Sequence, residues 1–315
     1  MPIIKILLIG FFCFFAQSLL AKPLTVLLDW YPNADHAPLF VAQANGFFKA
    51  QELDVKLISP TDPGDPLKIV AAGKADIAIS YQPALLMAVD QQIPLVRIGT
   101  LIDQPLNAIA VLSRSGITDL SQLKDKTIGY SVNGTDHIML NTAIQHAGLQ
   151  PNDVHLINVH YGLTQALMTG HVDAITGIMR NIEPFEMQNQ GQATRLFLYE
   201  DYGVPSYDEL IFVTNRDHVN DPRIPAFLSA LSLATQALLN DPNQGWQAFI
   251  TLNPALNNHL NHQSWFATLP YFPHDPAAFN AERYNTFATY LFKQHVIKAI
   301  PPLSSYTVMS SKDDK

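Results

Sequence analysis

The sequence predicts an α/β protein of two lobes, each a mostly parallel sheet flanked by helices, with a ligand cleft between the lobes. Strand patterns alternate with helical patterns along most of the chain, and one βαβαβ pattern occurs twice. The chain has 315 residues, of which 48% are hydrophobic and 15% charged, which is enough for two cores. Because ligands bind beyond the carboxyl ends of strands in such sheets, the cleft is the expected site.

The first βαβαβ pattern begins directly after residue 23. Its elements are strands at residues 24–28, 53–58 and 76–79 and helices at residues 36–45 and 65–72. Gly46 and Gly73 end the two helices, and Asp65-Pro66 begins the second. The loop at residues 30–33 lies at the carboxyl end of the first strand, where a ligand would bind.

The second pattern repeats the first about 100 residues later. Its elements are strands at residues 127–130, 154–159 and 173–176 and helices at residues 137–147 and 164–168. Residues 72–78 and 169–175 share the order small residue, Gly, two variable residues, Asp, apolar residue. We expect Asp76 and Asp173 to have a structural role, each bracing the turn into its strand.

The ends of the chain and the links between lobes define three parts. Residues 1–21 are predicted to be a secretory signal, because one lysine precedes a short apolar run that ends at Ala21. A retained N-terminal anchor is the alternative. Lobe 1 is predicted to comprise residues 22–112 and 214–315, and lobe 2 residues 113–213. A strand at residues 210–213 is expected to return to lobe 1, which the helices after residue 225 would then cover.

Charge and cysteine content limit the function classes. The chain has 19 Lys and Arg against 27 Asp and Glu, a net charge of −8, which argues against a nucleic-acid or anionic-membrane partner. Its one cysteine, Cys13, lies within the predicted signal. A mature chain without cysteine suits an oxidising compartment.

The first predicted strand and helix contain a motif that is similar to one in a known protein family. Residues 28–36 read Leu-Asp-Trp-Tyr-Pro-Asn-Ala-Asp-His, and residues 40–48 read Phe-Val-Ala-Gln-Ala-Asn-Gly-Phe-Phe. This stretch resembles the solute-binding proteins of the thiamine-pyrimidine family. The resemblance implies a type II periplasmic-binding-protein-like fold and a monomeric periplasmic receptor. Such a receptor delivers a small heteroaromatic ligand, such as formylaminopyrimidine, to the permease of an ABC importer, without a cofactor.

The same family has an enzyme branch, the thiamine-pyrimidine synthases of eukaryotes, which consume pyridoxal phosphate in an iron-dependent reaction. Those enzymes carry a Lys and a His just after the first Gly-x-x-Asp strand, where this chain reads Ser80-Tyr81-Gln82. Their cysteine-rich iron motif lies near the return strand, where residues 207–213 contain no cysteine. Because a Schiff base needs an amine and this iron motif needs thiolates, we expect binding without turnover.

A pyrimidine needs aromatic faces and a carboxylate for its exocyclic amine, which the resemblance places in lobe 1 and the return strand. We expect Trp30 and Tyr31 to form one face and Tyr81 to help close it. Asp208 or Glu209 is expected to accept the amine, and the adjacent Tyr207 is expected to contact the ligand as well. Asn33 and His36 are candidate polar contacts. The structural alternatives are packing for the aromatic rings, a helix cap for Asn33, a surface contact for His36 and a solvated charge for Glu209.

Lobe 2 is expected to contribute Ser131, Gly134 and Thr135, at the N-terminus of its first helix, and Arg180 after the strand that follows Asp173. An ordinary salt bridge is the alternative for Arg180.

Other kinds of site find little support in the sequence. Residues 129–134 have one residue too many for the nucleophile elbow of a serine hydrolase. His259 and His262 share a helix face but have no adjacent carboxylate for a metal. The remaining alternatives are a pyrimidine synthase and a receptor of the same fold for riboflavin or a sulfonate.

Overall fold

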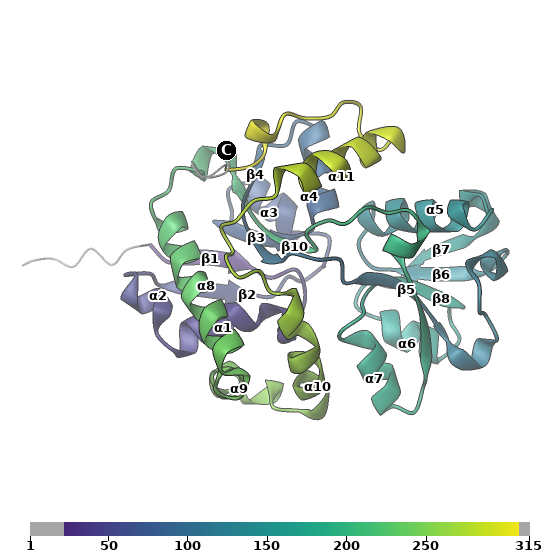
Figure 1. Ribbon diagram of the computed structural model, residues 1–315, viewed down its shortest axis with the longest axis horizontal. Helices are drawn as coiled ribbons and strands as arrows, with labels where there is room; N and C mark the ends of the chain where they lie inside the picture. The colour runs from purple at the N-terminus through teal and green to yellow at the C-terminus, as the bar shows by residue number, and fades with distance from the viewer. Residues whose placement is uncertain (1–21, 309–315) are drawn as a thin grey trace, which may run out of the picture.

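The computed structural model describes residues 22–308, which form two lobes side by side, joined by crossing segments (Figure 1). The predicted signal at residues 1–21 lies outside the described residues. Each lobe has a five-stranded mixed sheet with helices packed against it. The predicted α/β fold class is therefore confirmed.

The sheet of lobe 1 has the order β2-β1-β3-β10-β4. Its strands are β1 (Leu24–Leu27), β2 (Val55–Ile58), β3 (Ile77–Ser80), β4 (Leu95–Ile102) and β10 (Leu210–Asn215). β1 pairs in parallel with β2 and β3, whereas β10 runs antiparallel to both β3 and β4. The predicted βαβαβ pattern thus builds one half of the sheet, and a strand from much later in the chain completes it.

The sheet of lobe 2 has the order β7-β6-β8-β5-β9. Its strands are β5 (Asn107–Leu112), β6 (Thr127–Tyr130), β7 (His155–Asn158), β8 (Ala174–Met179) and β9 (Thr194–Leu198). β6 pairs in parallel with β7 and β8, and β5 lies antiparallel between β8 and β9. The two sheets therefore share one topology, as the sequence repeat predicts.

The chain crosses between the lobes earlier than the sequence predicts. The boundaries at 112/113 and 213/214 are wrong, because residues 107–112 form β5 of lobe 2 and residues 210–213 belong to β10 of lobe 1. The sequence pattern predicts both strands, but the alternation of strands and helices does not reveal the sheet in which each strand pairs. The crossing segments instead lie before Asn107 and before Leu210.

Helices cover both sheets and bury an apolar core in each lobe. In lobe 1 they are α1 (Ala37–Ala44), α2 (Phe47–Ala50), α3 (Pro66–Ala71), α4 (Gln82–Asp90), α8 (Arg223–Asn240), α9 (Pro242–Thr251), α10 (His259–Thr268) and α11 (Ala281–Lys293). In lobe 2 they are α5 (Thr135–His146), α6 (Leu163–Met168) and α7 (Glu183–Asn189). Within residues 22–308 no helix is both long and apolar enough to cross a bilayer.

The repeated aspartates have the structural role expected of them. Asp76 Oδ2 accepts the backbone N–H of Thr25 in β1 at 2.8 Å, and Asp173 Oδ2 accepts that of Thr127 in β6 at 2.9 Å. Each carboxylate thus ties the turn before the third strand of its βαβαβ pattern to the first strand of that pattern.

Candidate ligand-binding site

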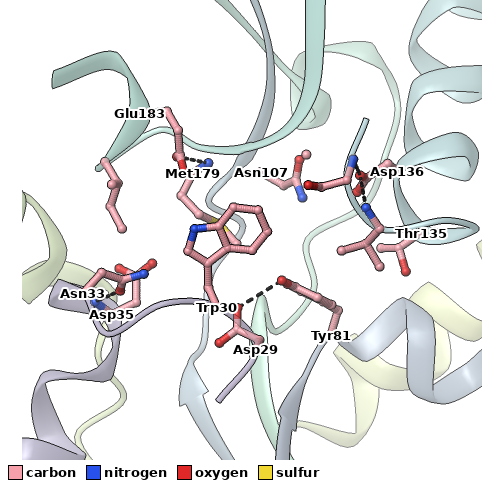
Figure 2. A pocket seen from close by; sticks show the side chains of 14 residues that line it. Asp29, Trp30, Asn33, Asp35, Tyr81, Asn107, Thr135, Asp136, Met179 and Glu183 are labelled. Carbon is pink, nitrogen blue, oxygen red and sulfur yellow. Dashed lines mark hydrogen bonds between the residues drawn. The ribbon is translucent and has the colours of Figure 1, made fainter. Parts of the chain in front are cut away.

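A cavity lies between the lobes, at the carboxyl ends of the strands of both sheets, as expected for open α/β sheets. The space open to a water-sized sphere in it is about 20 Å³, enough for about one water molecule, so a ring-sized ligand can enter only if the walls move apart. Its walls are formed by Asp29, Trp30, Asn33, Asp35, Tyr81, Asn107, Ser131, Val132, Thr135, Asp136, Gly177, Met179, Ile182 and Glu183. Figure 2 shows the indole of Trp30 in the middle of this group, with Tyr81 on one side and Glu183 on the other.

Asp29, two residues after the end of β1, is held by two partners on the lobe 1 wall. The Nε2 atom of His36 lies 2.9 Å from Asp29 Oδ1, and the hydroxyl of Tyr81 donates to Oδ2 at 3.0 Å. The His36 Nδ1 atom accepts the N–H of Asn33, so the Nε2 atom carries the proton that Asp29 accepts. His36 is fully buried and lies behind the cavity wall, so it orients Asp29.

Asn33 both caps a helix and lines the cavity. Its side-chain oxygen accepts the N–H of Asp35 at 2.9 Å and caps the short helix at residues 34–36. It also lines the cavity. The cap places the Asp35 carboxyl on the same wall, where burial raises the pKa of Asp35 to about 6.

Asp136, in the first turn of α5, forms the lobe 2 wall. Its Oδ2 atom accepts the N–H groups of Ser131 at 3.0 Å and Val132 at 2.9 Å, which shapes the loop after β6. Burial raises the pKa of Asp136 to about 7. The carboxylate packs on Gly177, where a Cβ would lie 2.5 Å from Asp136 Oδ2.

Glu183, the first residue of α7, completes this wall. Its Oε2 atom accepts the N–H of Met179 at 2.7 Å. Burial raises the pKa of Glu183 to about 8, so the acid form predominates at neutral pH. The carboxyl group can then donate one hydrogen bond and accept another. Together with Asp29, Asp35 and Asp136 it makes the cavity acidic, because the described residues that line it include no Lys or Arg.

Five of the residues predicted to bind the ligand line the cavity, from both lobes: Trp30, Asn33, Tyr81, Ser131 and Thr135. The structure thus brings together residues that lie up to about 100 positions apart in the sequence. That they contact the ligand stays a prediction.

Tyr31 and Gly134 lie outside the cavity, contrary to prediction. The Tyr31 ring is 52% exposed and packs on Tyr161 of lobe 2, with ring centroids 4.3 Å apart. Trp30 also packs against Tyr161, with ring centroids 4.5 Å apart, but of Trp30 and Tyr31 only Trp30 lines the cavity. Gly134 has a φ of +88° and packs against Met87 of lobe 1. Both residues form contacts between the lobes beside the cavity.

Arg180, Tyr207 and Glu209 lie at the crossing segments, also contrary to prediction. Arg180 forms two hydrogen bonds to Glu200, at 2.6 and 2.9 Å. Tyr207 and Glu209 are fully buried, and the Tyr207 hydroxyl donates to Glu209 Oε2 at 2.9 Å. Neither Glu209 nor Asp208 lines the cavity, and Asp208 accepts hydrogen bonds within lobe 1.

The residues predicted from the sequence include none of the four acidic residues that line the cavity. Asp29 stands next to Trp30 within the quoted motif and could have been selected there. Asp136 and Glu183 each lie in the first turn of a helix that follows a strand, a weaker signal. Nothing in the sequence marks Asn107, because the crossing brings it to the cavity.

The family model described as NMT1/THI5 like matches residues 33–245. The chain belongs to this family. A protein of Haemophilus influenzae named as a thiamine biosynthesis protein is 42% identical over 308 residues, covering 96% of this chain and 98% of the relative. The formylaminopyrimidine-binding protein of Halalkalibacterium halodurans is 32% identical over 228 residues, covering 72% of this chain and 69% of the relative.

The family also contains the 4-amino-5-hydroxymethyl-2-methylpyrimidine phosphate synthase THI5 of Saccharomyces cerevisiae. It is 30% identical over 261 residues, covering 79% of this chain and 76% of the relative. The predicted family membership, including the likeness to both a receptor and the synthases, is therefore confirmed.

Solved structures confirm the periplasmic-binding-protein fold. The alkanesulfonate-binding protein SsuA of Xanthomonas axonopodis pv. citri superposes with a TM-score of 0.71 at 17% identity, covering 91% of this chain and 98% of that one. The periplasmic aliphatic sulphonate binding protein SsuA of Escherichia coli superposes with a TM-score of 0.68 at 15% identity, covering 92% of this chain and 93% of that one. At these identities the likeness concerns the fold alone.

Proposed function

We propose that this protein is the periplasmic solute-binding component of an ABC importer. It binds a thiamine-related pyrimidine such as formylaminopyrimidine, as a monomer, and presents it unchanged to the permease. The observation that carries this proposal is the acidic cavity between the lobes, with an indole in its middle. The relative that is named as a formylaminopyrimidine-binding protein supports the choice of ligand.

The cavity offers what an aminopyrimidine requires. The indole of Trp30 can stack on a flat ring, and the carboxyl groups can accept its amine N–H bonds. The acid form of Glu183 can donate one hydrogen bond to the ligand and accept another. An anionic ligand would meet carboxylates without a compensating cation on the walls, which disfavours a sulfonate.

Binding without turnover is favoured by the residues of this chain. Position 82, just after β3, is Gln82, whose side chain has no basic amine for a Schiff base. Cys13 is the one cysteine of the sequence and falls within the predicted signal, so a cluster of thiolates cannot form in the mature chain. A synthase of the pyrimidine ring remains the alternative, because relatives at about 30% identity carry that name.

The proposal is tested with the mature protein. Native mass spectrometry of freshly purified protein should show a monomer with a co-purified small molecule. Calorimetric titration should then show one site for formylaminopyrimidine and no heat with an alkanesulfonate or riboflavin. Consumption of pyridoxal phosphate in the presence of iron would instead establish the synthase. Tight binding of the sulfonate or riboflavin alone would assign another ligand.

Trp30→Ala should weaken formylaminopyrimidine binding by roughly 1–3 kcal/mol, because it removes the stacking surface. Phe292→Ala, which truncates an exposed ring on α11, is the matched control and should bind like the wild type. Calorimetry measures both affinities, and circular dichroism checks the fold. Wild-type affinity in a folded Trp30→Ala variant would remove Trp30 from the site.

A further inference from the structure

Asn107 is the first residue of β5 and lies where the chain first enters lobe 2. Its side chain is 3% exposed and lines the cavity. Its Oδ1 atom is buried and has no hydrogen-bond partner among the described residues. Because a buried acceptor without a hydrogen bond destabilises the folded protein, the absence of a protein donor here points to a donor on the ligand.

The backbone of Asn107 is fixed from two directions. The Oε2 atom of Glu209 accepts the N–H groups of Leu106 at 2.6 Å and Asn107 at 2.8 Å. The guanidinium of Arg180 donates to the carbonyl oxygens of Leu106 and Asn107, both at 3.1 Å. Arg180 is in turn held by Glu200. The side chains of Glu209 and Arg180 therefore fix the backbone from which the Asn107 side chain extends.

Glu209 belongs to the second crossing segment, whereas Leu106 belongs to the first and Asn107 directly follows it. The hydrogen bonds from these two N–H groups to Glu209 Oε2 thus join the two crossings, and the Tyr207 hydroxyl adds a third bond within the second. These bonds lie next to the cavity wall that Asn107 forms. A ligand bound to Asn107 would therefore be tied directly to the segments that connect the lobes.

The chemistry of a carboxamide defines what Asn107 can recognise. It presents an N–H donor beside an oxygen acceptor, the pattern with which Asn pairs to the amino edge of adenine. A 4-aminopyrimidine presents the complementary pair, an amine N–H beside a ring nitrogen. A 4-oxopyrimidine presents the reverse pair, an oxygen beside a ring N–H, which the carboxamide can match only by turning over so that its oxygen and nitrogen exchange places.

We propose that Asn107 recognises the amino edge of the pyrimidine and that Glu209 is the positioning residue that holds Asn107 at the junction of the lobes. This inference rests on the proposed function. It assigns ligand specificity to a residue of the crossing segment, and it explains why a fully buried carboxylate lies beside the cavity without lining it.

Calorimetric titration with formylaminopyrimidine and its 4-oxo analogue tests the proposal. The wild type should prefer the amino compound. Asn107→Ala should lose about tenfold or more of this preference, because one buried hydrogen-bonded pair is removed. Asn107→Asp should also lose it, since it exchanges the N–H donor for a second oxygen. Asn240→Ala, at the exposed end of α8, is the control and should keep the wild-type preference.

Glu209→Gln keeps an oxygen that can accept the two backbone N–H groups and should therefore fold. It should reduce the preference for the amino compound, by less than Asn107→Ala, while affinity for the 4-oxo analogue stays unchanged. A purely structural role would lower both affinities equally and would overturn the positioning role. If the wild type binds the amino compound and folded Asn107→Ala keeps the full preference, the role of Asn107 is overturned and the proposed function stands. A wild type that binds no aminopyrimidine overturns both.

Discussion

Burial of acidic side chains in the cavity links the protein to the pH of its surroundings. Burial raises the pKa of Asp35 to about 6, of Asp136 to about 7 and of Glu183 to about 8. Because part of these carboxyl groups is protonated at neutral pH, the cavity walls carry less negative charge than their composition suggests. A ligand amine that favours the ionised forms would therefore release protons on binding.

Glu183 gives a prediction on stability. Its folded pKa of about 8 lies above the ordinary 4.5, so the folded state binds the proton more tightly than the unfolded state does. This contribution to the free energy of unfolding is complete below about pH 4.5 and is lost as pH rises through about 8. The loss is at most about 1.4 kcal/mol per pH unit. Glu183→Gln removes this pH-dependent contribution, so the unfolding free energy of the variant should fall less steeply between pH 5 and 8 than that of the wild type.

Urea denaturation of the unliganded protein at several pH values measures this slope. Glu282→Gln, at an exposed position of α11, is the matched control and should keep the wild-type slope. An unchanged slope in Glu183→Gln would show that the carboxyl does not carry the raised pKa.

Strand β8 illustrates how an element shapes the site. Ala108 of β5 pairs with Ile178 and Ile109 pairs with Thr176, so Gly177 is the extra residue of a β-bulge. Its φ of +84° favours glycine, and its missing side chain leaves room for the Asp136 carboxylate. The bulge therefore decides where the acidic end of α5 can lie.

Gly177→Ala should displace Asp136 and weaken its hydrogen bonds to the loop after β6. We expect a loss of roughly 2–4 kcal/mol in unfolding free energy, from backbone strain and the disturbed buried carboxylate. Gly170→Ala has a similar φ of +74° with no atom within 4 Å of the added Cβ, so it should lose roughly 1 kcal/mol. Urea denaturation compares the two variants, and equal losses would contradict the packing argument.

The two lobes are in contact on both sides of the cavity. The Asn181 amide of lobe 2 donates to Asp35 Oδ1 and to Thr268 Oγ1 of lobe 1, both at 2.6 Å, and is buried. On another side, the hydroxyls of Thr142 and Tyr290 lie 2.6 Å apart. Because hinge closure of this kind encloses a ligand, these contacts are expected to set the balance between open and closed forms.

Asn181→Ala should shift the unliganded protein toward the open form, since it leaves the buried Asp35 carboxyl without its amide donor. The radius of gyration from small-angle X-ray scattering should rise, and saturating formylaminopyrimidine should reduce it again. Asn189→Ala removes an exposed contact to Gln263 across the same lobes and should leave the radius unchanged. An equal radius in Asn181→Ala and the wild type would show that this contact does not hold the lobes together.

The sequence alone determined the two βαβαβ patterns, the roles of Asp76 and Asp173, the family and the presence of Trp30 at the carboxyl end of the first strand. These follow from local periodicity and short motifs, which neighbouring residues encode. Only the tertiary structure decided where the chain crosses between the lobes, and hence that Asn107 faces the cavity while Glu209 lies behind it. Strand pairing joins residues about 100 positions apart, and the direction of a side chain at a crossing depends on which strand it meets.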